Sequence, residues 1–267
     1  MSDDDAVAQY VTGMRELWGL ADYGPLAERL APAAAALVGA VAPVAGHRVL
    51  DLAAGTGTMA LLAAKQGAHV TACDISPRMV ELGREATTEA GLVIDWREAD
   101  AEALPLADSS FDLVLSSFGL IFVPRPAVAL AELRRVLVAG GRVGFTAWTP
   151  DGFMGAMTEL MRRWLPPQLA IADILDWGRA PVVRERLTAA GLTPVRTQRL
   201  TVPWRFDSPP AMTEFLLTHS PAHQASARAL GAQASEMFEA LERLANPDGG
   251  PVRIDAEYLL VIARHEQ

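Results

Sequence analysis

Cysteine and lysine are almost absent from this sequence. Cys73 is the only cysteine, so the chain can form neither an internal disulfide nor a zinc site built on several cysteines. Basic residues are also in deficit, 23 against 32 acidic ones, which gives a formal net charge of −9. Nucleic acids and anionic membranes select clusters of Lys and Arg, so we expect neither as a partner.

Long apolar runs are missing as well. The alanine-rich stretch 30–44 contains Pro32 and Pro43 and is too short to span a bilayer. The acidic N-terminus lacks the apolar core of a secretory signal, and together with the single cysteine this favours a reducing, cytoplasmic location. Of the 267 residues, 51% are hydrophobic and 21% charged, which is typical of a globular protein. A monomer and a homodimer both stay open.

Strand and helix patterns alternate along residues 47–148. Short apolar runs predict strands, and amphipathic segments between them predict helices. This alternation predicts an α/β fold with a parallel sheet and helices on both faces. The predicted strands here are 49–52, 70–73, 92–96, 111–117 and 142–148, and the predicted helices are 56–66, 76–90 and 125–137. Farther along, we expect helices at 153–165, 182–190 and 209–244 (broken near Ser220-Pro221) and strands at 193–206 and 254–263.

Three segments outside this alternating region predict a helical lid. Residues 1–46 read as two helices separated at 22–25, with Tyr10, Met14 and Trp18 on one helix face. Ligands of open α/β sheets lie at the carboxyl ends of the strands. If strand 193–206 is parallel to the others, the helical insertions 149–180 and 207–250 leave the sheet at that edge. We therefore expect residues 1–46 and both insertions to cover the site of a domain that spans 47–267.

The segment between the first strand and the first helix carries the decisive motif. Small residues at Ala53, Gly55 and Gly57 let the backbone turn sharply and approach a ligand. The helix that follows offers free N–H groups to a carboxylate or phosphate. Asp74 ends the second strand, where its carboxylate can accept both hydroxyls of a ribose. These two loops predict a nucleoside ligand at the carboxyl edge of the sheet.

Two later segments support the same ligand. Residues 98–105 follow the third strand, where an acidic side chain can meet an exocyclic adenine amine. The end of the fourth strand, at Ser116-Ser117-Phe118, is expected beside the ligand. The aromatic residues that are candidates to line the pocket are Trp18, Tyr23, Phe118, Phe122, Trp148 and Phe153.

Together these motifs resemble the class I S-adenosylmethionine (SAM)-dependent methyltransferases, in particular the small-molecule enzymes of quinone biosynthesis and their actinobacterial relatives. The resemblance is strong over 47–148. It implies a Rossmann-like, seven-stranded, mostly parallel sheet in the order 3-2-1-4-5-7-6. It also implies SAM as the cofactor and S-adenosylhomocysteine as the product.

The resemblance also implies a role for each loop. Asp51 and the glycine loop would hold the methionine part, Asp74 the ribose, and Asp100 with its neighbour the adenine. The family's first loop glycine is Ala53 here, and we expect a weakened fit at most. The predicted cofactor-binding residues are Trp18, Tyr23, Asp51, Ala53, Gly55, Thr56, Gly57, Asp74, Ile75, Met79, Asp100, Ala101, Ser117 and Phe118.

Two other functions compete with methyl transfer. A nicotinamide-dependent oxidoreductase is favoured by the match of 55–60 to the dinucleotide fingerprint. However, the only lysine, Lys65, has no tyrosine at the position that a Tyr-x-x-x-Lys pair requires. In addition, Asp51 would repel a pyrophosphate, whereas it attracts a methionine ammonium. A protein that binds SAM and catalyses a cyclisation or rearrangement shares the same motifs and stays open.

The acceptor is expected to be a small, partly apolar metabolite. The Asn/Asp-Pro-Pro-Tyr/Phe pattern of enzymes that methylate amino groups of nucleic acids is absent after the fourth strand, and the lone Asn246 argues against a magnesium site of the catechol type. We predict a metal-free, in-line displacement in which positioning supplies much of the rate; O, N and C acceptors stay open. His219 and His223, on one helical face if Pro221 permits, are candidate general bases, although solvent-exposed or capping roles are common for such residues.

Overall fold

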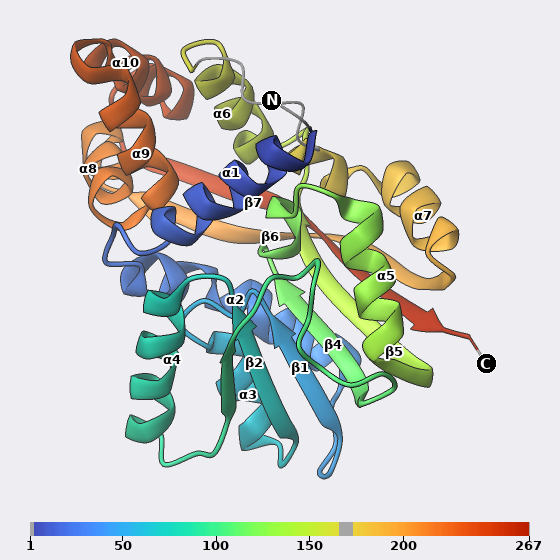
Figure 1. Cartoon of the computed structure of the whole chain (residues 1–267). Helices are drawn as coiled ribbons and strands as arrows, with labels where there is room; N and C mark the ends of the chain where they lie inside the picture. Colours follow the sequence, from blue (N-terminus) through green and yellow to red (C-terminus); the bar gives the residue numbers. More distant parts are fainter. Residues whose placement is uncertain (1–2, 166–172, 267) are drawn as a thin grey trace.

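The computed structural model describes residues 3–165 and 173–266 (Figure 1). The elements of the amino-terminal half are α1 (Asp3–Leu17), α2 (Gly24–Val41), β1 (Arg48–Leu52), α3 (Thr58–Lys65), β2 (His69–Asp74), α4 (Pro77–Glu89), β3 (Asp95–Glu98), β4 (Phe111–Ser117), η1 (Leu120–Phe122) and α5 (Pro126–Val136). Those of the other half are β5 (Leu137–Trp148), α6 (Phe153–Arg162), η2 (Ile174–Gly178), α7 (Ala180–Ala189), β6 (Leu192–Phe206), α8 (Pro209–His219), α9 (Pro221–Leu230), η3 (Gly231–Gln233), α10 (Ala234–Ala245) and β7 (Val252–His265).

The strands of the described chain form one 7-stranded sheet in the order β3-β2-β1-β4-β5-β7-β6. Strands β1 to β5 pair in parallel, and β7 is antiparallel to both β5 and β6. The predicted Rossmann-like fold and strand order are therefore confirmed. Since β6 runs parallel to β5, its end at Phe206 reaches the same edge as the ends of β1, β2 and β4. The chain after β6 therefore leaves the sheet at that edge.

The third strand begins later than the sequence pattern predicts. The apolar run 92–96 predicted a strand there, but β3 covers Asp95–Glu98. Gly91, with a φ of +63°, turns the chain away from α4, and Val93 is 92% exposed in the connecting loop. An edge strand needs few buried side chains, and in β3 only Trp96 is buried. The apolar run therefore misplaced the strand by several residues.

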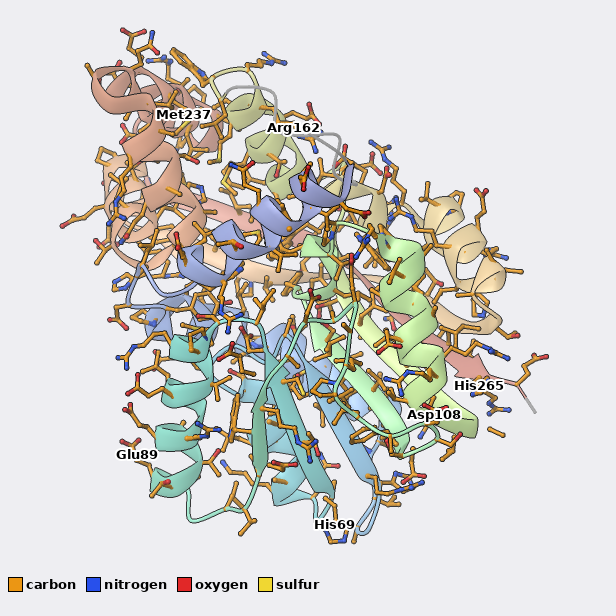
Figure 2. All side chains as sticks on the ribbon, in the orientation of Figure 1. His69, Glu89, Asp108, Arg162, Met237 and His265 are labelled. Carbon is orange, nitrogen blue, oxygen red and sulfur yellow. The ribbon has the colours of Figure 1, made fainter. Side chains whose placement is uncertain are left out.

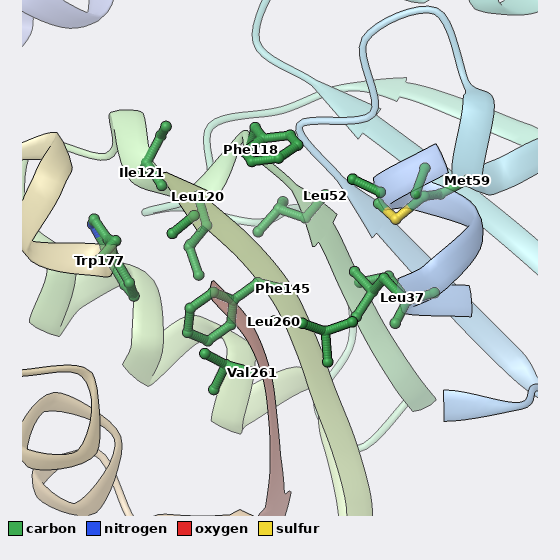
Figure 3. Packing of buried hydrophobic residues seen from close by; sticks show 14 of the residues in the cluster. Leu37, Leu52, Met59, Phe118, Leu120, Ile121, Phe145, Trp177, Leu260 and Val261 are labelled. Atoms are coloured by element: carbon green, nitrogen blue, oxygen red, sulfur yellow. The ribbon is translucent and has the colours of Figure 1, made fainter. Parts of the chain in front are cut away.

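Helices cover both faces of the sheet. Because crossovers between parallel strands are right-handed, α3 and α4 lie on one face and α5 and α7 on the other. Figure 1 shows α5 in front of the sheet and α2 and α3 behind it. The core occupies both faces (Figure 3): Phe145 meets Trp177 edge-on at 5.5 Å between ring centroids, and Leu37 and Met59 fill the other side.

The two edges of the sheet differ in what covers them. Figure 2 shows His69 and Asp108 at the edge where the strands begin, far from Met237 and Arg162 of the helical insertions. The edge where the strands end is crossed by α1 (Figure 1). Tyr10 of α1 donates a hydrogen bond of 3.0 Å to the carbonyl oxygen of Phe122, and Arg15 pairs with Glu98. These contacts fix α1 over the ends of β3 and β4. None of the described helices is long and apolar enough to cross a membrane.

Candidate functional site

A cavity opens at the carboxyl edge of the sheet, below α1. About 790 Å³ of space lies between its walls, part of it open solvent. The loops after β1, β2, β3 and β4 form its floor. Its lining residues are Tyr10, Val11, Met14, Trp18, Tyr23, Leu52, Ala53, Gly55, Asp74, Ile75, Met79, Ala99, Asp100, Ala101, Ser117, Phe118, Gly119, Phe122, Val123 and Pro124.

Most of the predicted cofactor residues meet in this cavity. Asp51, Thr56 and Gly57 are absent from the lining: Asp51 is buried, and the other two directly precede α3. The predicted residues that the structure brings together in the lining are Trp18, Tyr23, Ala53, Gly55, Asp74, Ile75, Met79, Asp100, Ala101, Ser117 and Phe118. Of the other candidate aromatic residues, Phe122 lines the cavity, whereas Trp148 and Phe153 do not.

The loop after β1 turns through three residues with positive φ. Gly55 and Gly57 have φ angles of +56° and +90°, which glycine adopts without strain. A Cβ on Gly57 would lie 2.7 Å from the Trp96 ring, so space as well as φ requires glycine. Ala53 has a φ of +53°, where an L-residue loses roughly 1 kcal/mol. This is the position at which the resemblance to the methyltransferases implies a glycine.

Asp51 contributes a buried carboxylate with one oxygen unsatisfied. Its Oδ2 accepts a 2.8 Å hydrogen bond from the N–H of Ala60, whereas Oδ1 has no partner among the described residues. Burial raises the pKa of Asp51 to about 8, and the bond from Ala60 offsets only part of this rise. A buried carboxylate oxygen requires a hydrogen-bonded or cationic partner. The ammonium group of a bound amino acid would supply one, so the residue fits the methionine part of SAM.

Asp74 joins the first two loops. Its Oδ2 accepts from the N–H of Gly55 at 2.8 Å, and Oδ1 accepts from the N–H of Ser76 at 2.9 Å. Burial raises the pKa of Asp74 to about 6, although the backbone hydrogen bonds act in the opposite direction. Each carboxylate oxygen can accept a second hydrogen bond. Asp74 therefore holds the glycine loop and still has lone pairs for the two hydroxyls of a ribose.

Replacing Asp74 by alanine is expected to weaken the binding of S-adenosylhomocysteine by about 5- to 150-fold, because the ribose loses a charged acceptor worth roughly 1–3 kcal/mol. Isothermal calorimetry measures the dissociation constant. Glu89→Ala, at the exposed far end of α4 (Figure 2), removes a carboxylate outside the cavity and serves as the control. An unchanged dissociation constant in Asp74→Ala would contradict the assignment.

The part of the cavity where adenine is expected has apolar walls and is bordered by a hydrogen-bonded loop. Ile75, Met79 and Ala101 supply apolar walls, and Asp100 stands beside them. Asp100 Oδ1 accepts from the N–H of Glu102 at 2.9 Å. The buried Glu102 carboxylate in turn accepts from the N–H and Nε of Arg125, at 2.6 and 2.7 Å. These bonds fix the loop in which an acid next to adenine was expected.

Phe118 adopts a strained backbone at the end of β4. Its φ of +56° is rare for an aromatic residue, and such strain concentrates at functional sites. The hydroxyl of the buried Thr146 accepts from the Phe118 N–H at 3.1 Å, and the Phe118 ring stacks on Trp148 with 4.0 Å between centroids. Thr146 and Trp148 therefore hold Phe118 in the wall of the cavity, directly after β4.

Several lining residues were not predicted as site residues. Tyr10 and Met14 share the predicted helix face, but that pattern does not say what the face covers. Gly119 follows β4 directly, and nothing in its local sequence marks it. The other lining residues that sequence reasoning missed are Val11, Leu52, Ala99, Val123 and Pro124.

The two candidate general bases do not line the cavity. His219 ends α8 and His223 lies in α9. The condition for one shared helical face is not met, because Ser220 is extended and Pro221, which lacks an N–H, starts a new helix at the predicted break. His223 is buried, with Nδ1 2.7 Å from the Ser220 hydroxyl and Nε2 without a partner among the described residues. His219 contacts the loop before α2.

Neutral His223 is expected to make the fold sensitive to acid. Burial lowers the pKa of His223 from 6.5 to about 4. The unfolded chain therefore binds a proton below pH 6.5 that the folded chain refuses until about pH 4. Stability that is complete above pH 6.5 is lost as the pH falls between these values, by about 2 kcal/mol at pH 5. Denaturant unfolding at both pH values should show that the change from pH 7 to pH 5 costs His223→Gln about 2 kcal/mol less stability than the parent. Equal losses would show that His223 is not buried in its neutral form.

Within residues 3–165 and 173–266, no group of three or more His, Cys, Asp or Glu side chains could hold a metal ion. The acidic residues of the cavity lining are instead Asp74 and Asp100. The fold and this cavity suit an α/β protein whose ligand is a nucleoside that carries an amino acid.

Comparisons with known proteins specify the class. A family profile described as "Methyltransferase domain" matches residues 50–145. An uncharacterized protein of Mycobacterium tuberculosis is 40% identical over 201 residues, which cover 74% of this chain and 73% of that protein. A demethylmenaquinone methyltransferase of Clavibacter sepedonicus is 39% identical over 177 residues, 61% of this chain and 72% of the relative. The crystal structure of the YcgJ protein from Bacillus subtilis shares the fold, with a TM-score of 0.64 at 19% identity, over 88% of this chain and 98% of that one.

The chain belongs to the class I SAM-dependent methyltransferases, in the group that resembles the quinone-biosynthesis enzymes. The predicted family, enzyme class and cofactor are therefore confirmed. A nicotinamide-dependent oxidoreductase, the main alternative, is set aside.

Proposed function

We propose that this enzyme transfers the methyl group of SAM to a small, partly apolar metabolite by in-line displacement and without a metal ion. The observation that carries this proposal is the wall opposite the cofactor residues. Tyr10, Val11 and Met14 of α1 face the cavity together with residues 122–124. All of these side chains are uncharged, so they favour a neutral, apolar acceptor. The net charge of −9 supports a small molecule over a nucleic acid.

When bound, SAM supplies an electrophilic methyl group on a positively charged sulfur. The chain's own residues then have to hold the acceptor in line with that group and exclude water, and such positioning can supply a large part of the rate. Tyr10 is suited to a wall: its hydroxyl donates to the Phe122 carbonyl, and burial raises its pKa to about 12. It therefore stays protonated at neutral pH.

We also propose that residues 1–46 and the insertions 149–180 and 207–250 act together as the lid. Support comes from the lining, because α1 and Tyr23 cover the cavity directly. Figure 1 shows α8, α9 and α10 gathered at one end of α1 and α6 near the other. Residues 166–172 of the first insertion lie outside the described part of the chain.

The test is incubation of the enzyme with SAM and a panel of quinone, phenolic and polyketide acceptors, followed by mass spectrometry. We expect a product heavier by one CH₂ group, together with an equal amount of S-adenosylhomocysteine. NMR of the product then identifies the methylated atom. Asp51→Asn is the matched control, since it removes the proposed cofactor contact with little change in shape. Conversion to an isomer of the acceptor without consumption of SAM would instead indicate a cyclisation or rearrangement.

A further inference from the structure

His219 links the helical insertion to the loop between α1 and α2. It is the last residue of α8, because Ser220 is extended and Pro221 begins α9. Its Nδ1–H donates a 2.9 Å hydrogen bond to the carbonyl oxygen of Asp22, and the same nitrogen lies 3.8 Å from Asp22 Oδ2. The ring also packs against Phe215 of α8, with 4.9 Å between centroids. The imidazole is thus oriented from both sides.

The residue after Asp22 is part of the cofactor site. Tyr23 lines the cavity, and a Cβ placed on Gly55 would lie 3.5 Å from its Cε1. The ring of Tyr23 therefore rests on the glycine loop, and its phenol feels the charge of Asp74. It also meets Trp18 edge-on at 5.7 Å. Whatever fixes the 22–23 peptide fixes the cover of the cofactor loops.

We propose that His219 is a positioning residue for the cofactor, which holds the Asp22 carbonyl and thereby keeps Tyr23 seated on Gly55. The geometry favours this role over that of a general base. His219 is not in the cavity lining, and its Nδ1 proton is committed to a backbone carbonyl. Tyr23 is the residue before α2 and makes no capping hydrogen bond through its side chain. The role concerns the cofactor half of the site, so it holds whichever acceptor is methylated.

The first test measures the binding of S-adenosylhomocysteine by calorimetry, which needs no acceptor. His219→Leu removes the donor and is expected to weaken binding about fivefold, the effect of one neutral hydrogen bond. His219→Asn retains an N–H donor near the position of Nδ1 and should bind nearly as the parent does. His265→Leu is the matched control: its Nδ1 also contacts backbone carbonyls, those of Leu137 and Val138, but at the far end of β7 (Figure 2). It should leave the affinity unchanged.

The second test asks whether the effect travels through Tyr23. In a Tyr23→Leu background, His219→Leu should cause no further loss of affinity, because the group that it seats is gone. Hydrogen exchange should also show faster exchange over residues 18–24 in His219→Leu than in His219→Asn. Exchange needs only folded protein, and the paired variants separate local loosening from global destabilisation.

Three results would overturn the proposal. One is an unchanged dissociation constant in His219→Leu, which is the result expected of a general base. Another is an equal loss with and without Tyr23, which would indicate a general structural role. The third is a loss in His219→Asn as large as in His219→Leu. A failure of the acceptor screen would leave all three measurements intact, so the two proposals fail separately.

Discussion

Binding of S-adenosylhomocysteine at pH 7 is expected to release roughly 0.8 proton per molecule bound. Burial holds the pKa of Asp51 at about 8 in the protein alone, so about nine molecules in ten carry a protonated Asp51 at pH 7. An ammonium group placed against Oδ1, the unpartnered oxygen, favours the carboxylate and expels that proton. The ligand's α-amino group, with an ordinary pKa near 7.8, takes back about a tenth of a proton.

The same linkage sets the pH dependence of affinity. Below pH 7 the binding constant should fall by nearly tenfold per pH unit, since one proton has to leave Asp51 for each ligand bound; between pH 8 and 7 the fall should be only about two- to threefold. Above pH 8 the ligand's own amine loses its proton, so affinity should decline again. Binding is therefore expected to be tightest near pH 8. The stability of the protein without ligand depends on pH in the opposite direction. Because the pKa of Asp51 is raised in the folded state, the free energy of unfolding falls as the pH rises from 4 toward 8.

Calorimetry in buffers of different ionisation enthalpy measures the released proton directly. Two controls isolate Asp51. One is 5′-methylthioadenosine, which keeps the nucleoside but lacks the amino acid and should release almost no proton. The other is Asp51→Asn, which should abolish proton release. It should also weaken the binding of S-adenosylhomocysteine by about 10- to 150-fold, which corresponds to the loss of a charged hydrogen bond. Proton release that persists in Asp51→Asn would show that another group titrates.

The sequence predicted the floor of the site because that floor is local. Asp74 is the last residue of β2 and Asp51 the last but one of β1, and the ends of neighbouring parallel strands meet at one edge. Once the alternation of strands and helices is recognised, the position of these residues follows from chain order alone. The parallel direction of β6 was only a condition of that reasoning, and the strand pairing of the structure meets it.

The cover of the site could not be predicted because it depends on distant contacts. Tyr10 is held by a carbonyl 112 residues away, and His219 meets a carbonyl 197 residues away. Helix periodicity shows that α1 has an apolar face but not what the face packs on. The burial of His223 was missed for the same reason, since its neighbour Phe238 comes from α10. Local apolarity also misplaced β3, where Val93 is exposed.

Gly119→Ala is expected to displace the loop after β1, although Gly119 itself follows β4. Gly119 has helical backbone angles that any residue can adopt, so only space is at issue. A Cβ at this position would lie 2.4 Å from the Cβ of Ala53 and 3.0 Å from its carbonyl oxygen. Such overpacking costs about 1–3 kcal/mol. We expect this loss in denaturant unfolding and a fall of about tenfold or more in the affinity for S-adenosylhomocysteine, because the displaced loop carries Gly55.

The partner of this clash is the residue at which the chain departs from its family. Ala53→Gly removes the Cβ and suits a φ of +53°, so alone it should stabilise the fold by up to roughly 1 kcal/mol. Combined with Gly119→Ala it should restore most of the lost affinity, since only the 3.0 Å contact with the carbonyl of residue 53 and the 3.2 Å contact with Ser116 Oγ remain tight. The double-mutant cycle is expected to give a coupling energy of about 1–2 kcal/mol. Additive effects would mean that a Cβ added at position 119 does not clash with the Cβ of Ala53.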